Sequence, residues 1–432
     1  MPLKPSLLTH FAMILASFFF SQQAYSEVIS HYNTEDNTVA EDNTAFGLIN
    51  DLVQGNTAFA LDIYALLKNN NSGNLFLSPY SLSTALGMTY VGAKGATQEQ
   101  MSQVLHFPRN QDELHPAFHQ LQQQVVQAQK NVVLNIANAL WGQKAYPFLP
   151  TFSENVATYY QANLKSADFT NAEVIRQEIN TWVEGKTNNK IKDLVKQGVI
   201  TELTRLALVN AIYFKGDWAN PFTAEKTKAM PFWLNHNDSV DVSMMTQKNY
   251  FEYRDVERDN LQILALPYGT HPTRAAYDKN NLSMIILLPT KRNGLAQLEN
   301  ALTPETLETW LRWLRFQKVN VFLPKFKINS GFELSKPLSE MGMPDAFSPD
   351  NADFSGIDGT RDLSISSVIH QAFVEVNEQG TEAAAATAVF ATTRGLPPPT
   401  PEFRADHPFI FLIRHNSSGS ILFMGRVVNP QM

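Results

Sequence analysis

The stretch Glu378–Phe409 reads EQGTEAAAATAVFATTRGLPPPTPEFRADHPF and is the most informative part of the chain. It begins near Gly380, continues with small, almost uncharged residues, and then reaches a lone Arg394 and a proline-rich segment. Neither a helical stripe nor an apolar–polar alternation runs through it. A connection of this length inside a compact domain is generally functional or disordered.

Arg394 lies at the junction of two segments of different character. The small residues before it carry little charge, so either face of that run can be buried. The prolines after it cannot join a β-ladder and prefer an extended conformation. An exposed arginine in an extended segment suits the specificity pocket of a trypsin-like protease, which holds an aspartate. From these residues alone, protease bait and a disordered linker are both open interpretations.

The stretch resembles the hinge and reactive loop of the serpins. The hinge pattern is carried by Glu378, Gly380, Thr381, Glu382, Ala383, Ala384, Ala385 and Ala386. The closing pattern is carried by Phe403, Ala405, Asp406, His407, Pro408, Phe409 and Phe411. In inhibitory serpins the bait residue is usually the seventeenth counted from the hinge glutamate, and that residue is Arg394 here. The resemblance implies Arg394–Gly395 as the scissile bond, within a reactive loop of about residues 378–406.

The resemblance extends over residues 49–432. Serpin-like fragments recur in family order at 74–81, 187–194, 208–218, 323–326 and 423–430. Each fragment alone is weak, but their order is specific. The resemblance implies an α+β fold with three β-sheets, eight to nine helices, and a reactive-centre loop exposed at one pole.

The resemblance also assigns two polar clusters. The residues that match the shutter of the family, a cluster beneath the centre of the main sheet, are Ser78, Ser81, Asn210 and His370. The residues that match its breach, where the loop enters the sheet, are Trp218, Lys325 and Glu378. An ion pair is expected between Lys325 and Glu378. Ordinary hydrogen-bonded core polarity is the alternative interpretation of the shutter residues.

The mechanism implied by the resemblance is suicide inhibition of a trypsin-like serine protease. After cleavage the loop inserts into the main sheet and traps the acyl-enzyme. The alternate residues that would then face the core are Thr381, Ala383, Ala385, Thr387, Val389 and Ala391, all uncharged. This pattern favours an active inhibitor.

Three alternatives to this interpretation stay open. In the first alternative, the chain is a non-inhibitory carrier or chaperone. In the second, it inhibits papain-like cysteine proteases through the same loop. The proline-rich segment is two or three residues longer than in many serpins, so Thr393 or Leu396 is a second candidate for the bait residue.

Composition narrows the remaining function classes. The 432 residues are 44% hydrophobic and 17% charged, which suits one large globular domain or two smaller ones. Neither an internal repeat nor a second composition regime occurs, so we expect a single domain over residues 49–432. The net charge of −7 gives no basic excess for nucleic acid or a membrane surface. Cysteine is absent, which excludes disulfides. No G-x-S-x-G, H-E-x-x-H or G-x-G-x-x-G motif occurs, so we expect neither an enzyme nor a cofactor.

Residues 111–129 raise two further questions of partners. His115 and His119 have a metal-binding spacing, but Pro116 lies between them and no third ligand is evident, so we expect no metal. The segment lacks a Lys/Arg cluster, so the heparin-binding helix of some serpins has no evident counterpart. The expected protein partner is the target protease, and the chain itself is expected to be a monomer.

The N-terminus has the features of a secretory signal. Lys4 precedes an apolar core at residues 7–20, and Ala24-Tyr-Ser26 provides a small-x-small cleavage site. We expect a signal peptide at 1–26 and a flexible acidic, Asn/Thr-rich leader at 27–48. Secretion follows, either extracellular or, in a bacterium, periplasmic; an uncleaved anchor is the alternative.

Local patterns predict several elements. Strands are expected at 132–141, 206–214, 261–268, 282–288 and 319–326, and helices at 111–129, 152–164, 174–183 and 303–314. Ser78, which precedes Pro79, is expected to cap a helix.

Overall fold

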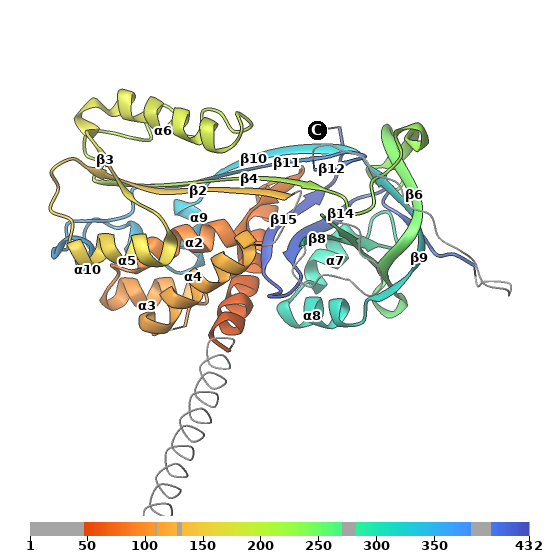
Figure 1. Ribbon diagram of the computed structural model, residues 1–432, viewed down its shortest axis with the longest axis horizontal. Helices are drawn as coiled ribbons and strands as arrows, with labels where there is room; N and C mark the ends of the chain where they lie inside the picture. The colour runs from red at the N-terminus through yellow and green to blue at the C-terminus, as the bar shows by residue number, and fades with distance from the viewer. Residues whose placement is uncertain (1–46, 109, 128–131, 270–281, 382–398, 432) are drawn as a thin grey trace, which may run out of the picture. The chain divides into compact units, whose positions relative to one another are not determined.

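The computed structural model describes residues 47–108, 110–127, 132–269, 282–381 and 399–431 (Figure 1). The chain divides into residues 1–50 and a compact unit, Asp51–Met432. The expected signal peptide and nearly all of the expected leader lie outside the described residues. So do the reactive bond and most of the hinge, from 382 to 398. Those expectations stay predictions.

Among the described residues, the main sheet has six strands in the order β10-β11-β4-β2-β3, with β12 paired to β4. Its strands are β2 (Val132–Gln143), β3 (Leu164–Ala167), β4 (Leu206–Asp217), β10 (Phe326–Glu333), β11 (Val368–Val376) and β12 (Gly380–Thr381). Residues 208–214 of β4 are all buried. Their near-continuous apolar run predicts this, because a central strand covered on both faces needs no polar side.

Helix α6 (Ala172–Lys186) covers one face of the main sheet, here called the outer face (Figure 1). Its buried residues Ile175, Ile179 and Val183 belong to the same core as Val209 and Ala211 of β4. Helices α2, α4 and α5 lie on the opposite side of the sheet (Figure 1). The two faces of the main sheet therefore have separate cores.

The part of the chain that the structure describes forms a second sheet of nine strands, in the order β1-β15-β14-β8-β7-β6-β9-β13, with β5 paired to β6. Its strands are β1 (Leu75–Leu77), β5 (Lys228–Trp233), β6 (Ser239–Val256), β7 (Leu261–Pro267), β8 (Leu282–Pro289), β9 (Arg315–Pro324), β13 (Glu402–Arg404), β14 (Phe409–His415) and β15 (Ile421–Val427). The expected third sheet, β5, β13 and the paired ends of β6 and β9, continues from it without a break. The reason is the 18-residue β6, which pairs with β7 at one end and with β5 and β9 along the rest.

The helices agree with the α+β fold that the sequence predicts. After the helical residues 47–69 follow α2 (Pro79–Tyr90), α3 (Gly95–Val104), α4 (Gln111–Gln127), α5 (Pro150–Tyr160), α6, α7 (Leu295–Ala301), α8 (Pro304–Arg312), α9 (Ser335–Met341) and α10 (Ser355–Asp358). Ser78 caps α2 by accepting a hydrogen bond from the Ser81 backbone N–H at 3.1 Å. The helix expected at 152–164 was too long, because Gln161 adopts a left-handed conformation at its end and Leu164 begins β3.

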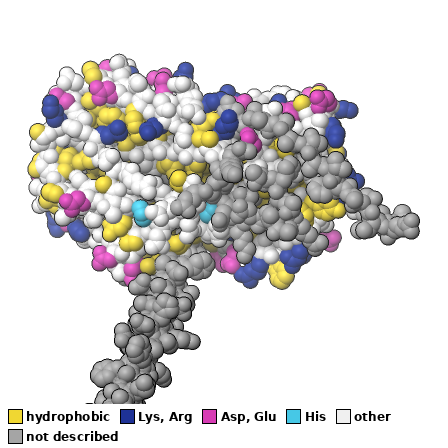
Figure 2. Space-filling model, viewed as in Figure 1, with side chains coloured by type: hydrophobic (Ala, Val, Ile, Leu, Met, Phe, Trp, Pro, Cys, Tyr) yellow, Lys and Arg dark blue, Asp and Glu magenta, His cyan; other side chains and the backbone are white. Residues whose placement is uncertain are grey.

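The described surface mixes charges of both signs. Scattered lysine and arginine side chains lie among scattered acidic ones on the face in view (Figure 2). Within the described residues, no helix is both long and apolar enough to cross a bilayer. The same part of the chain contains no cluster of three metal-binding side chains; His115 is instead bonded to Tyr160.

Candidate functional site

The hinge begins where the chain leaves β11 and turns back toward β4. Asn377 and Gly380 exchange backbone hydrogen bonds across this turn, at 2.9 and 3.3 Å. Strand β12 then pairs antiparallel with β4, with Gly380 opposite Asp217 and Thr381 opposite Gly216. At Thr381, the last residue described before residue 399, the chain therefore runs antiparallel to β4 and is paired with it.

Only glycine suits position 380. Its φ of +141° lies in a region that other residues rarely adopt. A Cβ atom there would lie 2.2 Å from the carbonyl oxygen of Gly216 and 2.7 Å from the Trp218 nitrogen. The close approach of hinge and β4 thus depends on the absence of a side chain.

The three breach residues meet at this turn. Lys325 Nζ lies 2.9 Å from Glu378 Oε2, which is the expected ion pair. The backbone carbonyls of Glu378 and Gln379 accept hydrogen bonds from the Phe222 and Trp218 N–H groups, at 2.7 and 2.8 Å. The Trp218 indole N–H donates to the Asn377 carbonyl at 3.0 Å. The hinge is thereby fastened to the end of β4 and to the residues that follow it.

Glu378 is held as a carboxylate. Burial alone would raise its pKa, but hydrogen bonds from Lys325 and Thr227 outweigh burial and keep the pKa below its usual value. The Thr227 hydroxyl donates to Glu378 Oε1 at 2.9 Å. Thr227 was not predicted as a site residue, because it follows a short 3₁₀ turn and belongs to no serpin-like fragment.

The four shutter residues also come together, in the middle of the β4–β11 ladder. Asn210 and His370 lie opposite each other in the parallel pairing of the two strands. The Asn210 amide donates to Ser81 Oγ at 2.7 Å, and the Ser78 backbone N–H donates to His370 Nε2 at 3.0 Å. His370 Nδ1 is hydrogen-bonded to Asn210 Oδ1. The cluster connects α2 to both strands.

These partners determine the protonation of His370. Nε2 accepts a hydrogen bond from a backbone N–H, so Nδ1 carries the proton and donates to Asn210. Complete burial lowers the pKa of His370 to about 3. The imidazole is therefore neutral at physiological pH, and both of its nitrogens are used.

Asn138 of β2 is a further member of this cluster that the sequence did not indicate. Its Oδ1 accepts hydrogen bonds from the Asn210 amide at 2.6 Å and from the Ser81 hydroxyl at 3.1 Å. Asn138 is one polar residue in an alternating strand. Only the pairing of β2 with β4, which puts Asn138 opposite Asn210, reveals its role.

The described part of the main sheet, with a hinge turned onto its central strand β4 and a polar cluster that joins β4 to β11, has the architecture of a serpin. The serpin (serine protease inhibitor) family pattern matches residues 54–430, and the chain belongs to that family. The protease inhibitors of this family are not enzymes.

Relatives within the family are similar over nearly their whole length. Human leukocyte elastase inhibitor is 44% identical over 387 residues, covering 88% of this chain and 99% of that protein. Human thyroxine-binding globulin in complex with thyroxine is 33% identical, with a TM-score of 0.78 over 89% of this chain and 99% of that one. A loop-inserted, cleaved ovalbumin mutant is 31% identical, with a TM-score of 0.77 over 88% of this chain and all of that one.

Proposed function

We propose that this serpin is a suicide inhibitor of trypsin-like serine proteases and is cleaved at Arg394–Gly395. The observation that carries the proposal is the register of β12 on β4. Continued down β4, it brings Thr387 opposite Asn210. Continued along β11 from the Asn377–Gly380 turn, it brings the same Thr387 opposite His370. Because Asn210 and His370 are already paired, an inserted strand fits both neighbours in one register.

The chemistry begins as ordinary proteolysis. The protease serine hydroxyl attacks the carbonyl carbon of Arg394, and its proton passes through the protease histidine to the departing amine of Gly395. The products are an ester between Arg394 and the protease serine and a new amino terminus at Gly395. Water would normally hydrolyse the ester. Insertion of residues 382–391 carries the attached protease away before that happens.

Insertion is favoured because it forms new hydrogen bonds and because it buries no charged side chain. Some ten additional strand residues form hydrogen bonds of about 0.5–1.5 kcal/mol each, on the order of 10 kcal/mol in total. The side chains that face the core are small and uncharged, so no charge is buried. The parallel β4–β11 pairing that is lost is replaced by two antiparallel pairings.

The arginine supports the choice of target. A trypsin-like specificity pocket holds an aspartate that pairs with arginine, whereas an elastase pocket is small. The leukocyte elastase inhibitors that this chain resembles favour a second candidate, an elastase-like target with Thr393 as the bait residue. The similarity to thyroxine-binding globulin keeps a carrier function as a third.

The test is incubation with trypsin, elastase and papain, followed by denaturing gels and mass spectrometry. We expect an SDS-stable complex with trypsin and a released peptide that begins at Gly395. Arg394→Ala should abolish that complex, and Thr393→Ala serves as the matched control that keeps it. A complex with elastase that survives Arg394→Ala would transfer the bait to Thr393. Clean cleavage without any complex would contradict inhibition.

We also propose that the chain acts after secretion. The support is the apolar segment at residues 7–20 and the cleavage site that follows it. Sequencing the N-terminus of the mature protein tests this, with Glu27 as the expected first residue. An intact Met1 on the protein inside the cell would contradict it.

A further inference from the structure

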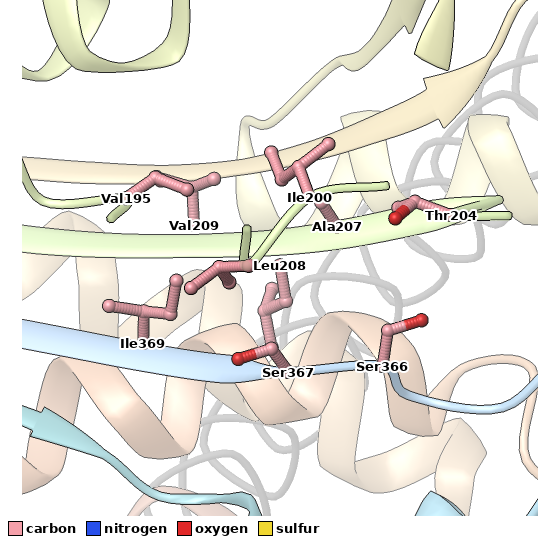
Figure 3. A pocket seen from close by; sticks show the side chains of 10 residues that line it. Val195, Ile200, Thr204, Ala207, Leu208, Val209, Ser366, Ser367 and Ile369 are labelled. Atoms are coloured by element: carbon pink, nitrogen blue, oxygen red, sulfur yellow. The ribbon is translucent and has the colours of Figure 1, made fainter. Parts of the chain in front are cut away.

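A small cavity lies on the main sheet where β4 and β11 part. It measures about 20 Å³, room for roughly one water molecule. The residues that line it are Val195, Val199, Ile200, Thr204, Ala207, Leu208, Val209, Ser366, Ser367 and Ile369 (Figure 3). Side chains from β4 and from the segment that enters β11 lie on opposite sides of this space (Figure 3).

The cavity exists because the ladder stops there. The described pairing of β4 with β11 ends at Leu208 and Val368. Beyond that pair the two chains are no longer hydrogen-bonded to each other, and a wedge opens between Ala207 and Ser367. Val195, Val199 and Ile200, from the connection between α6 and β4, cover the wedge.

This cover is fastened in place and apolar. The Asn180 side chain of α6 donates to the Val195 carbonyl at 3.0 Å and accepts from the Val195 N–H at 2.9 Å. Arg176 donates to the same carbonyl at 3.0 Å. Val195 and Ile200 are buried and belong to the outer core. The wedge is therefore a largely apolar site that is covered by a fixed segment and left unfilled between β4 and the segment that enters β11.

The register of β12 indicates which residue of the loop would fill this wedge. Continued down β4, it brings Phe390 opposite Ala207, at the cavity. Side chains alternate along a strand, so Phe390 faces the opposite side from Thr387. Asn210 and His370 bond to residues at the start of α2, so Thr387 between them would face the α2 side of the sheet. Phe390 therefore faces the outer core, beneath Ile200, which lies over Ala207 (Figure 3). The other inserted residues with this orientation are Glu382, Ala384, Ala386 and Ala388, so Phe390 is the one bulky apolar side chain among them.

We propose that this cavity is the docking site for Phe390 of the chain's own reactive loop. The inference rests on the proposed loop insertion. Parting β4 and β11 to admit one strand widens the wedge by about 4.8 Å, which admits the phenyl ring. The docked ring holds the far end of the inserted strand, four residues before the ester to the protease. Phe390 is thus a positioning residue that secures the trapped state.

The test compares the cleaved forms of wild type and Phe390→Ala. Thermolysin is a metalloprotease that forms no acyl-enzyme, so it cuts the loop without being trapped; product cut at Gly395–Leu396 is selected by mass spectrometry. Unfolding temperatures in guanidinium chloride are then measured before and after cleavage. We expect the uncleaved proteins to unfold alike, cleavage to stabilise both, and the cleaved variant to unfold several degrees below cleaved wild type. Phe390→Leu should restore part of the difference.

A double-mutant cycle with Ile200→Ala locates the contact. The two substitutions should be non-additive in the cleaved form and additive in the uncleaved form. Equal stabilisation of wild type and Phe390→Ala by cleavage would overturn the docking of Phe390 while leaving loop insertion intact. Absence of any stabilisation in cleaved wild type would overturn insertion, and the docking with it.

Discussion

Gly380 is the residue at which a single methyl group has the largest predicted effect on the hinge. Gly380→Ala puts a Cβ within 2.2 Å of a backbone oxygen at a φ of +141°. We expect it to lower the free energy of unfolding by about 1–3 kcal/mol and to release the hinge from β4. Urea denaturation measures the first effect. Gly185→Ala is the control, because its added Cβ meets nothing within 4 Å in α6 and should be neutral or slightly stabilising.

His370 makes stability depend on pH. Burial lowers its pKa to about 3, below the usual 6.5, so the unfolded chain takes up the proton first as pH falls. The stability from the neutral imidazole is complete above about pH 6.5 and declines between 6.5 and 3. Protonated Nε2 can no longer accept from Ser78. His115, whose pKa burial lowers to about 4, acts in the same direction.

This pH dependence is measured by urea denaturation between pH 7 and 5, above the range in which carboxylates are protonated. Each histidine contributes up to about 1.4 kcal/mol per pH unit. Wild type should lose stability over this interval, and His370→Gln should lose less per pH unit although it starts from a lower value. An unchanged slope in His370→Gln would show that the shutter is not the sensor.

At the scale of elements, the sequence predicted those strands and site residues that a local pattern of residues indicates. β4 was predicted because seven successive buried residues leave a continuous apolar run. The hinge and shutter residues were found through serpin-like fragments. Strand β6 was not predicted, since polar residues interrupt its alternation where it crosses from one sheet region to the next. Asn138 and Thr227 were missed because their partners, Asn210 and Glu378, lie 72 and 151 residues away.

Helix α6 and its connection to β4 act as one element over the outer face. Asn180→Ala removes both hydrogen bonds to Val195 and leaves a buried N–H and C=O with fewer partners. We expect a loss of about 1–3 kcal/mol in the free energy of unfolding, measured by guanidinium denaturation. Glu178→Ala, on the exposed face of the same helix, is the control and should change stability by less than about 0.5 kcal/mol. Equal effects of the two substitutions would mean that the clamp on Val195 contributes nothing.

At the scale of the whole molecule, the six-residue β4–β11 ladder closes the main sheet, and the proposed loop insertion requires it to open. The same polar cluster would then serve both states. Asn210 and His370 are hydrogen-bonded to each other while the sheet is closed, and the registers of both strands would place Thr387 between them after the proposed insertion. A small hydroxyl at that position supplies a donor and an acceptor to replace the bond that is broken.

Thr387→Glu tests this coupling between the loop and the whole sheet. The substitution changes a residue of the loop, none of the sheet, and adds no trypsin site, so we expect the uncleaved variant to fold with wild-type stability and to be cut by trypsin at Arg394. Insertion would bury an unpaired carboxylate between Asn210 and His370, at a cost of several kcal/mol. We therefore expect a substrate that forms no SDS-stable complex and gains no thermal stability on cleavage. Thr400→Glu, on the C-terminal side of the scissile bond, is the matched control and should remain an inhibitor. A Thr387→Glu variant that still traps trypsin would show that the inserted strand does not take the register continued from β12.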